Sequence, residues 1–163
     1  MKILFLDFDG VLNCSVTFAR RSAKIAAEGM PDDKEDWKLT HLDEFLIPNL
    51  NPIVEQTKCK IVVSSSWRIG YDLATLAKWL AKKGFKYPET IIDRTPTIPL
   101  VDYSRGTEIK TWLSKHPEVT GYAILDDDIE DILPLHPMNT IRTSGQKGLT
   151  PDKAADVIMV LSR

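Results

Sequence analysis

Short unbroken apolar runs alternate along the chain with segments of helical periodicity. The run KILFLDF, residues 2–8, is typical of a strand that is covered on both faces. Four further runs resemble it, the last of them shorter, at residues 60–65, 90–93, 122–128 and 139–143. Apolar residues recur at helical spacing in three other segments, at residues 72–84, 104–116 and 150–163. This alternation predicts an α/β fold with a parallel sheet of about five strands and right-handed crossovers.

Residues 14–58 break this rhythm. They are mostly polar with a helical pattern, and they include the loop sequence GMPDDKEDW. We interpret them as a small helical, cap-like insertion after the first strand, above the sheet edge where that strand ends. The prediction is a single domain over residues 1–163 with this insertion inside it.

Composition narrows the class of protein. The chain has 163 residues, of which 43% are hydrophobic and 27% charged, as in a soluble globular domain with a sizeable core. The net charge of -2 argues against a large basic nucleic-acid footprint, although it leaves room for a local one. Two cysteines, Cys14 and Cys59, favour reduced thiols in a cytoplasm. We expect no signal peptide and no membrane span, because no apolar run approaches the ~20 residues that cross a bilayer.

Three of the predicted strands end in groups suited to phosphate chemistry. The first ends in Asp7-Phe8-Asp9-Gly10, the second in three serines at 64–66, and the fourth in three aspartates at 126–128. Ligands of open parallel sheets bind beyond the carboxyl ends of the strands, so these groups would meet at one edge. Taken singly, each has an ordinary explanation as a turn, a helix cap or a polar loop. Their joint occurrence after apolar strands predicts a shared site.

The spacing of the first two acids carries a chemical argument. Side chains alternate along a strand, so Asp7 and Asp9 point to the same side. Two carboxylates so close repel each other, and each resists ionisation. A divalent cation removes the conflict, and oxygen-only ligands suit Mg²⁺.

These motifs resemble those of the haloacid dehalogenase (HAD) superfamily of phosphohydrolases. FLDFDGVL is similar to its first motif, IVVSSSW to the second, SRGTEI to the third and AILDDD to the fourth, in the right order over nearly the whole chain. A narrower resemblance, to the HAD domains of Swiss Army Knife RNA-repair proteins, rests on SSSWR, RGTEIKTWL, ILDDD and GLT together. The resemblance implies a three-layer Rossmann-like fold.

The resemblance also implies a mechanism. Asp7 would be the nucleophile that forms an aspartyl-phosphate, and Asp9 the general acid and base. Mg²⁺ would bind Asp7, the main-chain carbonyl of Asp9 and Asp126, with Asp127 holding a metal water or orienting the basic residue. Gly10 would let the backbone pass closely under the phosphate.

The serine and basic positions keep alternatives. Alignment through the tryptophan of the second motif favours Ser65 as the phosphate donor, whereas counting from the strand favours Ser64. Arg105, at a helix start, is the expected basic residue of the third motif, with Lys110 as its alternative.

Two further assignments concern the surroundings of the site. Ser66 and Arg68 are candidate substrate-binding residues, although Arg68 could equally be a surface arginine. Asp128 and Asp131 are expected to cap the helix that follows.

Several functions compete. The first is a Mg²⁺-dependent phosphatase, and the narrower resemblance suggests RNA or DNA end phosphates as its substrates. Trp37 could stack on a base of such a substrate, or it could serve only in packing. A small-metabolite or nucleotide phosphomonoesterase is its rival. From another class come a phospho-aspartate signalling module and a catalytically silent binding domain. Substrate choice would depend on the insertion and on the loop at 94–103.

Overall fold

The computed structural model describes residues 1–98 and 104–163. Its centre is an all-parallel sheet of five strands, in the order β3-β2-β1-β4-β5. The strands are β1 (Lys2–Leu6), β2 (Lys60–Val63), β3 (Ile91–Arg94), β4 (Gly121–Asp126) and β5 (Thr140–Arg142). Each matches an apolar run of the sequence, and the predicted α/β fold is confirmed.

Seven α-helices connect or flank the strands within the described residues. They are α1 (Ser15–Glu28), α2 (Lys34–Leu39), α3 (Leu50–Thr57), α4 (Trp67–Gly70), α5 (Leu73–Lys82), α6 (Arg105–Ser114) and α7 (Pro151–Leu161). Two 3₁₀ turns, η1 (Ile47–Asn49) and η2 (Pro88–Thr90), complete the set. Side-chain caps begin several of these helices, as for α7, where the Thr150 hydroxyl accepts from the Lys153 N–H at 3.3 Å. None of the described helices is both long enough and apolar enough to cross a membrane.

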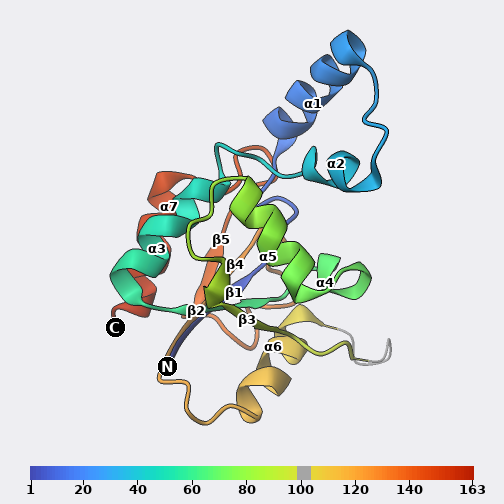
Figure 1. The fold of residues 1–163 in the computed structure, drawn as a ribbon. Coiled ribbons are helices and arrows are strands. Elements are labelled where there is room, and N and C mark those ends of the chain that lie inside the picture. Colours follow the sequence, from blue (N-terminus) through green and yellow to red (C-terminus); the bar gives the residue numbers. More distant parts are fainter. Residues whose placement is uncertain (99–103) are drawn as a thin grey trace.

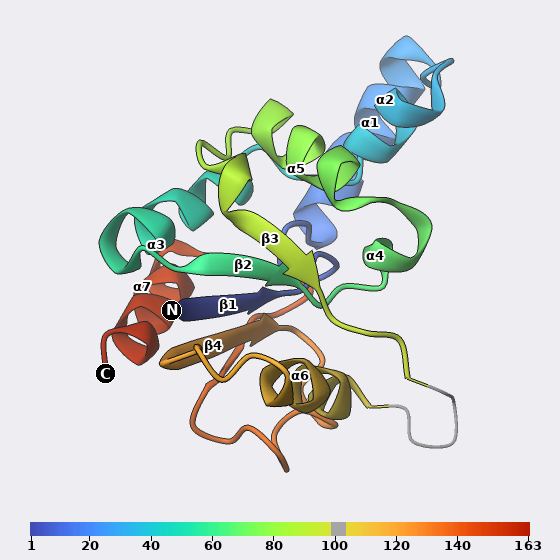
Figure 2. The same ribbon diagram turned by 60° about the horizontal axis from the view of Figure 1, so that its bottom comes forward.

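The sheet is covered on both faces, which gives three layers (Figure 2). Alternate residues of β1 face opposite ways: Leu4 and Leu6 join the larger core with α3, α5 and α7, whereas Ile3 and Phe5 join a second core with α6. All four of these side chains are fully buried. The continuous apolar run at the chain start is therefore explained by burial on both sides.

The expected insertion divides into two parts. Helices α1 and α2 project away from the sheet (Figure 1), and α1 buries one residue, Thr17. Helix α3 instead packs beside α7, with Leu50 and Ile53 fully buried in the larger core. The projecting part is thus α1 and α2, while α3 serves as the crossover helix between β1 and β2.

Candidate active site

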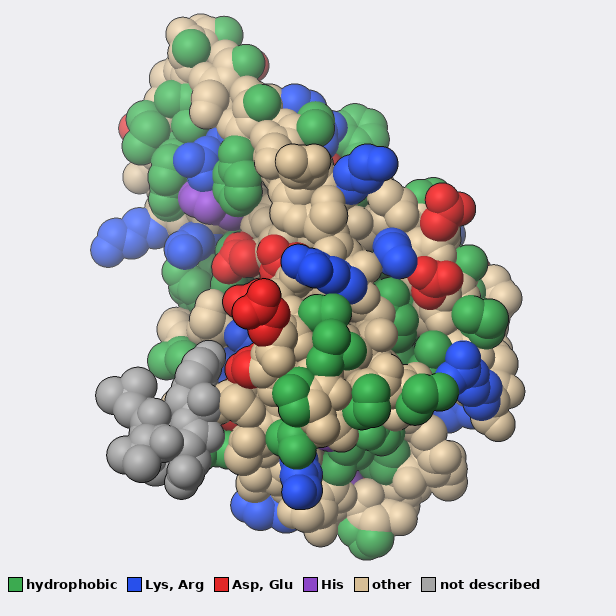
Figure 3. Space-filling model, turned by 180° about the vertical axis from the view of Figure 1, so that it is seen from behind, with side chains coloured by type: hydrophobic (Ala, Val, Ile, Leu, Met, Phe, Trp, Pro, Cys, Tyr) green, Lys and Arg blue, Asp and Glu red, His purple; other side chains and the backbone are tan. Residues whose placement is uncertain are grey.

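The carboxyl ends of β1 and β4 bring three aspartates together. The two strands are neighbours in the sheet, and the Asp7 N–H donates to the Leu125 carbonyl at 3.0 Å. One carboxylate oxygen from each of Asp7, Asp126 and Asp127 lies within 4.8 Å of the others. Acidic side chains also gather on this side of the molecule, beneath the projecting helices (Figure 3). Of the three strand ends predicted to meet at one edge, the topology brings those of β1 and β4 together through these acids.

The electrostatics of the cluster favour a cation. Burial and the nearby charge of Asp7 raise the pKa of Asp126 to about 8. The pKa of Asp7 is also raised, chiefly by burial, and that of Asp127 by burial and by Asp7. Carboxylates that resist ionisation together are well placed for a divalent ion, whose charge would offset their repulsion. The oxygen-only donor set fits Mg²⁺.

Gly10 leaves the space that Asp127 occupies. Its φ is +69°, a conformation that L side chains rarely adopt, and a Cβ built there would lie 2.2 Å from both Cγ and Oδ2 of Asp127. The Gly10 carbonyl accepts from the Thr143 hydroxyl at 2.8 Å, which ties this turn to the segment after β5. A glycine is required here on two independent grounds.

Arg105 reaches the cluster from the first turn of α6. Its Nη1 lies 3.3 Å from Asp7 Oδ1 and 3.4 Å from Asp126 Oδ2. Its alternative, Lys110, is exposed, and within the described residues no hydrogen bond or ion pair joins it to the cluster. Of the two basic candidates, the structure brings Arg105 to the acids.

The helix-capping role expected for Asp128 and Asp131 is wrong. Residues 127–139 are all described and contain no helix, so there is no following helix for either residue to cap. The Oδ2 of Asp131 instead accepts from the Arg105 N–H at 2.6 Å. This carboxylate holds the N-terminus of α6, where a negative charge is favoured, and so helps place Arg105. Only the fold brings the two positions together, so the sequence carried no signal of the contact.

The three serines differ in their surroundings. Ser64 and Ser65 are fully buried, whereas Ser66 is exposed. The Ser65 hydroxyl hydrogen-bonds the Asp7 carboxylate, which works against the raised pKa of that acid. Ser64 Oγ has no hydrogen-bond partner among the described residues. The contact to Asp7 therefore belongs to Ser65, while the role of either hydroxyl toward a phosphate stays a prediction.

Arg68 is not a surface arginine. It is 3% exposed, and its guanidinium donates to the carbonyls of Ser64, Ser65, Thr95 and Pro96. It also forms an ion pair of 2.6 Å with Glu108, which is fully buried in α6. These contacts fasten the loop after β2 to α6, and substrate binding by Arg68 stays a prediction.

Asp9 is not one of the three clustered acids. It is exposed, and its two carboxylate oxygens accept from Asn13 Nδ2 at 2.9 Å and Trp67 Nε1 at 3.0 Å. Neither donor is among the candidate site residues: Asn13 directly follows the first motif, and Trp67 serves only to align the second motif. Metal binding by the Asp9 carbonyl stays a prediction.

The comparison with protein families decides the relationship. Residues 3–154 match the model described as HAD domain in Swiss Army Knife RNA repair proteins. The chain belongs to this family. No curated protein and no solved structure matches it.

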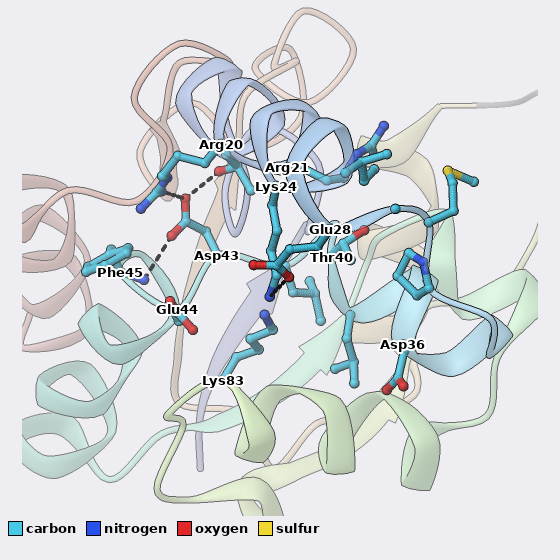
Figure 4. Close-up of a pocket in the computed structure, with 17 residues that line it drawn as sticks. Arg20, Arg21, Lys24, Glu28, Asp36, Thr40, Asp43, Glu44, Phe45 and Lys83 are labelled. Carbon is cyan, nitrogen blue, oxygen red and sulfur yellow. Dashed lines mark hydrogen bonds and ion pairs between the residues drawn. The ribbon is translucent and has the colours of Figure 1, made fainter.

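A cavity of about 510 Å³ separates the projecting helices of this HAD domain from its body (Figure 4). Its charged lining is balanced: Arg20, Arg21, Lys24 and Lys83 face Glu28, Asp36, Asp43 and Glu44. None of the three clustered aspartates lines it. The cavity therefore lacks the positive charge that would draw a phosphate, and the acidic cluster is the better candidate for chemistry.

Proposed function

We propose that this HAD domain is a Mg²⁺-dependent phosphatase that works through an aspartyl-phosphate on Asp7 and acts on nucleic-acid end phosphates. The observation that carries the proposal is the cluster of Asp7, Asp126 and Asp127 beside Arg105. Asp7, Asp126 and Asp127 would hold the ion. Bound there, it would shield the negative charge of the phosphate from the attacking carboxylate.

The reaction consists of two displacements at phosphorus, and Asp7, Asp9 and Arg105 have different roles in them. An Asp7 oxygen bonds to phosphorus while the bond from phosphorus to the leaving oxygen breaks, and Asp9 gives that oxygen its proton. Asp9 then takes a proton from water, whose oxygen attacks phosphorus and releases Asp7 and inorganic phosphate. Arg105 would offset charge on the phosphoryl oxygens, and its place against Asp7 supports this role.

Phosphate release from an aryl phosphate tests the reaction. We expect turnover with Mg²⁺, loss of turnover with EDTA, and loss of at least 1,000-fold in Asp7→Asn with the circular dichroism spectrum unchanged. Asp128→Asn is the matched control, because Asp128 is an exposed neighbour outside the cluster. Full activity in Asp7→Asn would remove the nucleophile and with it the proposal.

The nucleic-acid substrate is supported by the family description and by an aromatic and cationic group on the insertion. Trp37 is half-buried, contacts the His41 ring edge-on at 5.0 Å, and has the Arg21 guanidinium 4.8 Å from its ring centre. The His41 carbonyl accepts from the same Asn13 amide that holds Asp9, so this group borders the acid–base side of the site. A base could stack there.

Substrate comparison separates this reading from a small-molecule phosphatase. We expect 3′-phosphorylated oligonucleotides to have a higher kcat/KM than mononucleotides and sugar phosphates. Trp37→Ala should raise KM about 10-fold for the oligonucleotide and leave the aryl phosphate unaffected. Phe45→Ala is the control, since Phe45 also lies under an arginine, Arg20 at 4.6 Å, but lines the balanced cavity. Equal kcat/KM for all substrates would exclude the nucleic-acid assignment.

A further inference from the structure

Both oxygens of the Asp9 carboxylate accept hydrogen bonds from neutral N–H groups. Asn13 Nδ2 donates to Oδ1 at 2.9 Å, and Trp67 Nε1 donates to Oδ2 at 3.0 Å. We propose that Asn13 and Trp67 are positioning residues that fix the Asp9 carboxylate for its proton transfers. The inference rests on the acid–base role proposed for Asp9 and extends it to two residues outside the acidic motifs.

Asn13 is itself locked in place. It is 1% exposed, and its Oδ1 accepts from the Gly10 N–H at 2.9 Å. Its Nδ2 donates to the His41 carbonyl at 3.0 Å as well as to Asp9. These partners define which end of the amide is oxygen, because a flipped amide would place NH₂ against an N–H. Asn13 thus holds Asp9 at a fixed distance from the turn at Gly10 and from the insertion.

Trp67 is held by packing. It is 8% exposed and begins α4, and its ring contacts Phe8 at 5.5 Å and Trp79 at 6.2 Å between centroids. The Lys38 ammonium lies 5.1 Å from the ring centre on the insertion side. A ring fixed by these contacts presents its N–H in one direction, so the second donor to Asp9 is as constrained as the first.

The arrangement suits a group that must both give and accept a proton. Each carboxylate oxygen has two lone pairs, so one donor per oxygen leaves a second lone pair for the leaving group or water. Neutral donors also avoid the strong ion pair that a lysine or arginine would form. Without them an exposed aspartate would sample several rotamers, and general acid catalysis depends on its position.

The test uses the leaving group as the readout. A good acid matters most when the leaving oxygen is a poor leaving group, so an alkyl phosphate is compared with p-nitrophenyl phosphate. In Trp67→Phe we expect kcat to fall about 10-fold for the alkyl phosphate and less than 3-fold for the aryl phosphate, with KM unchanged. Asn13→Asp keeps the acceptor for the Gly10 N–H but removes the donor to Asp9. It should likewise lower the ratio of kcat for the alkyl phosphate to kcat for the aryl phosphate.

Trp79→Phe is the matched control. Trp79 lies in the same aromatic cluster and is 3% exposed, but its Nε1 has no hydrogen-bond partner among the described residues. It should keep the wild-type ratio of the two kcat values. If Trp67→Phe lowers kcat for both substrates by the same factor, or gives the same kcat values as Trp79→Phe, the role of Trp67 is packing and the inference is wrong.

Asp9→Asn distinguishes this failure from failure of the proposed function. One outcome is that Asp9→Asn lowers kcat for the alkyl phosphate more than for the aryl phosphate while Trp67→Phe and Asn13→Asp do not. In that case the acid–base role of Asp9 stands, and the positioning role of Asn13 and Trp67 is wrong. If Asp9→Asn keeps the wild-type ratio, Asp9 is not the acid, and both assignments are overturned.

Discussion

The ion pair between Arg68 and Glu108 offers the sharpest test of how the site is held. Arg68 is 3% exposed, Glu108 is fully buried, and 2.6 Å separates Nη2 from Oε2. Burial raises the pKa of Glu108, and Arg68 is the largest influence that lowers it again. Arg68→Met keeps much of the apolar volume but leaves the carboxyl without its main counter-charge. We expect a large loss of stability that depends on pH.

The magnitude follows from the contacts. Removing one partner of a buried pair costs about 3–5 kcal/mol, a large part of the roughly 5–15 kcal/mol that stabilises a typical domain. Arg68 also donates to four carbonyls, worth about 0.5 kcal/mol each at the low end. The lost bonds, about 2 kcal/mol, and the stranded charge, about 3–5 kcal/mol, together give an expected loss of about 5–7 kcal/mol. The double variant Arg68→Met/Glu108→Gln should recover the second part, about 3–5 kcal/mol.

Urea unfolding at pH 5.5 and pH 8 checks the direction in which the stability of Arg68→Met changes with pH. In Arg68→Met the folded-state pKa of Glu108 rises further above its unfolded value, so the folded protein binds more protons and stability falls as pH rises through that range. The deficit against the wild type should thus be smaller at pH 5.5. Arg94→Met is the control, since Arg94 is exposed and donates to one carbonyl, and it should cost under 1 kcal/mol. A single variant as stable as this control, or a double variant no more stable than the single, would refute the reasoning.

Two further predictions concern the acidic cluster. Gly10→Ala should reduce Mg²⁺-dependent phosphate release at least 100-fold, because its Cβ would overlap Asp127. The control Gly29→Ala has φ +87° and open space around its Cβ, so it should lose only about 1 kcal/mol of stability in urea unfolding. Because the pKa of Asp126 is raised to about 8 from 3.8, the metal-free protein should lose stability as pH rises from 5 to 8, and saturating Mg²⁺ should remove that loss. Melting temperatures measured across this pH range in EDTA and in Mg²⁺ check the prediction. A melting temperature that rises with pH in EDTA would contradict it.

The sequence predicted those parts of the site that follow from strand periodicity. Asp7 and Asp126 end apolar runs that became neighbouring strands, so their meeting follows from parallel topology alone. Arg105 could be expected because it begins a periodic helix. Arg68 could not be placed, because its burial depends on how the loops after β2 and β3 pack against α6.

Contacts made across the chain by single polar side chains were beyond sequence reasoning. Trp67 and Asp9 are 58 positions apart, and Asp131 and Arg105 are 26 apart. Neither pair has a spacing or composition that marks it, since each contact is set by loop conformation. The insertion shows the same limit: polarity grouped residues 14–58 together, although the apolar face of α3 belongs to the core.

The two kinds of buried acid in this chain differ in how their charge is balanced. Glu108 has Arg68 at 2.6 Å as its counter-charge, and the pair joins the loop after β2 to α6. Asp7, Asp126 and Asp127 share Arg105, which lies 3.3 Å from the first and 3.4 Å from the second. With all three ionised, three negative charges and one positive leave a deficit of two, the charge of one divalent cation. Burial raises the pKa values of these three acids, and the repulsion between them raises those of Asp126 and Asp127 further; proteins keep such an unfavourable arrangement where binding offsets it.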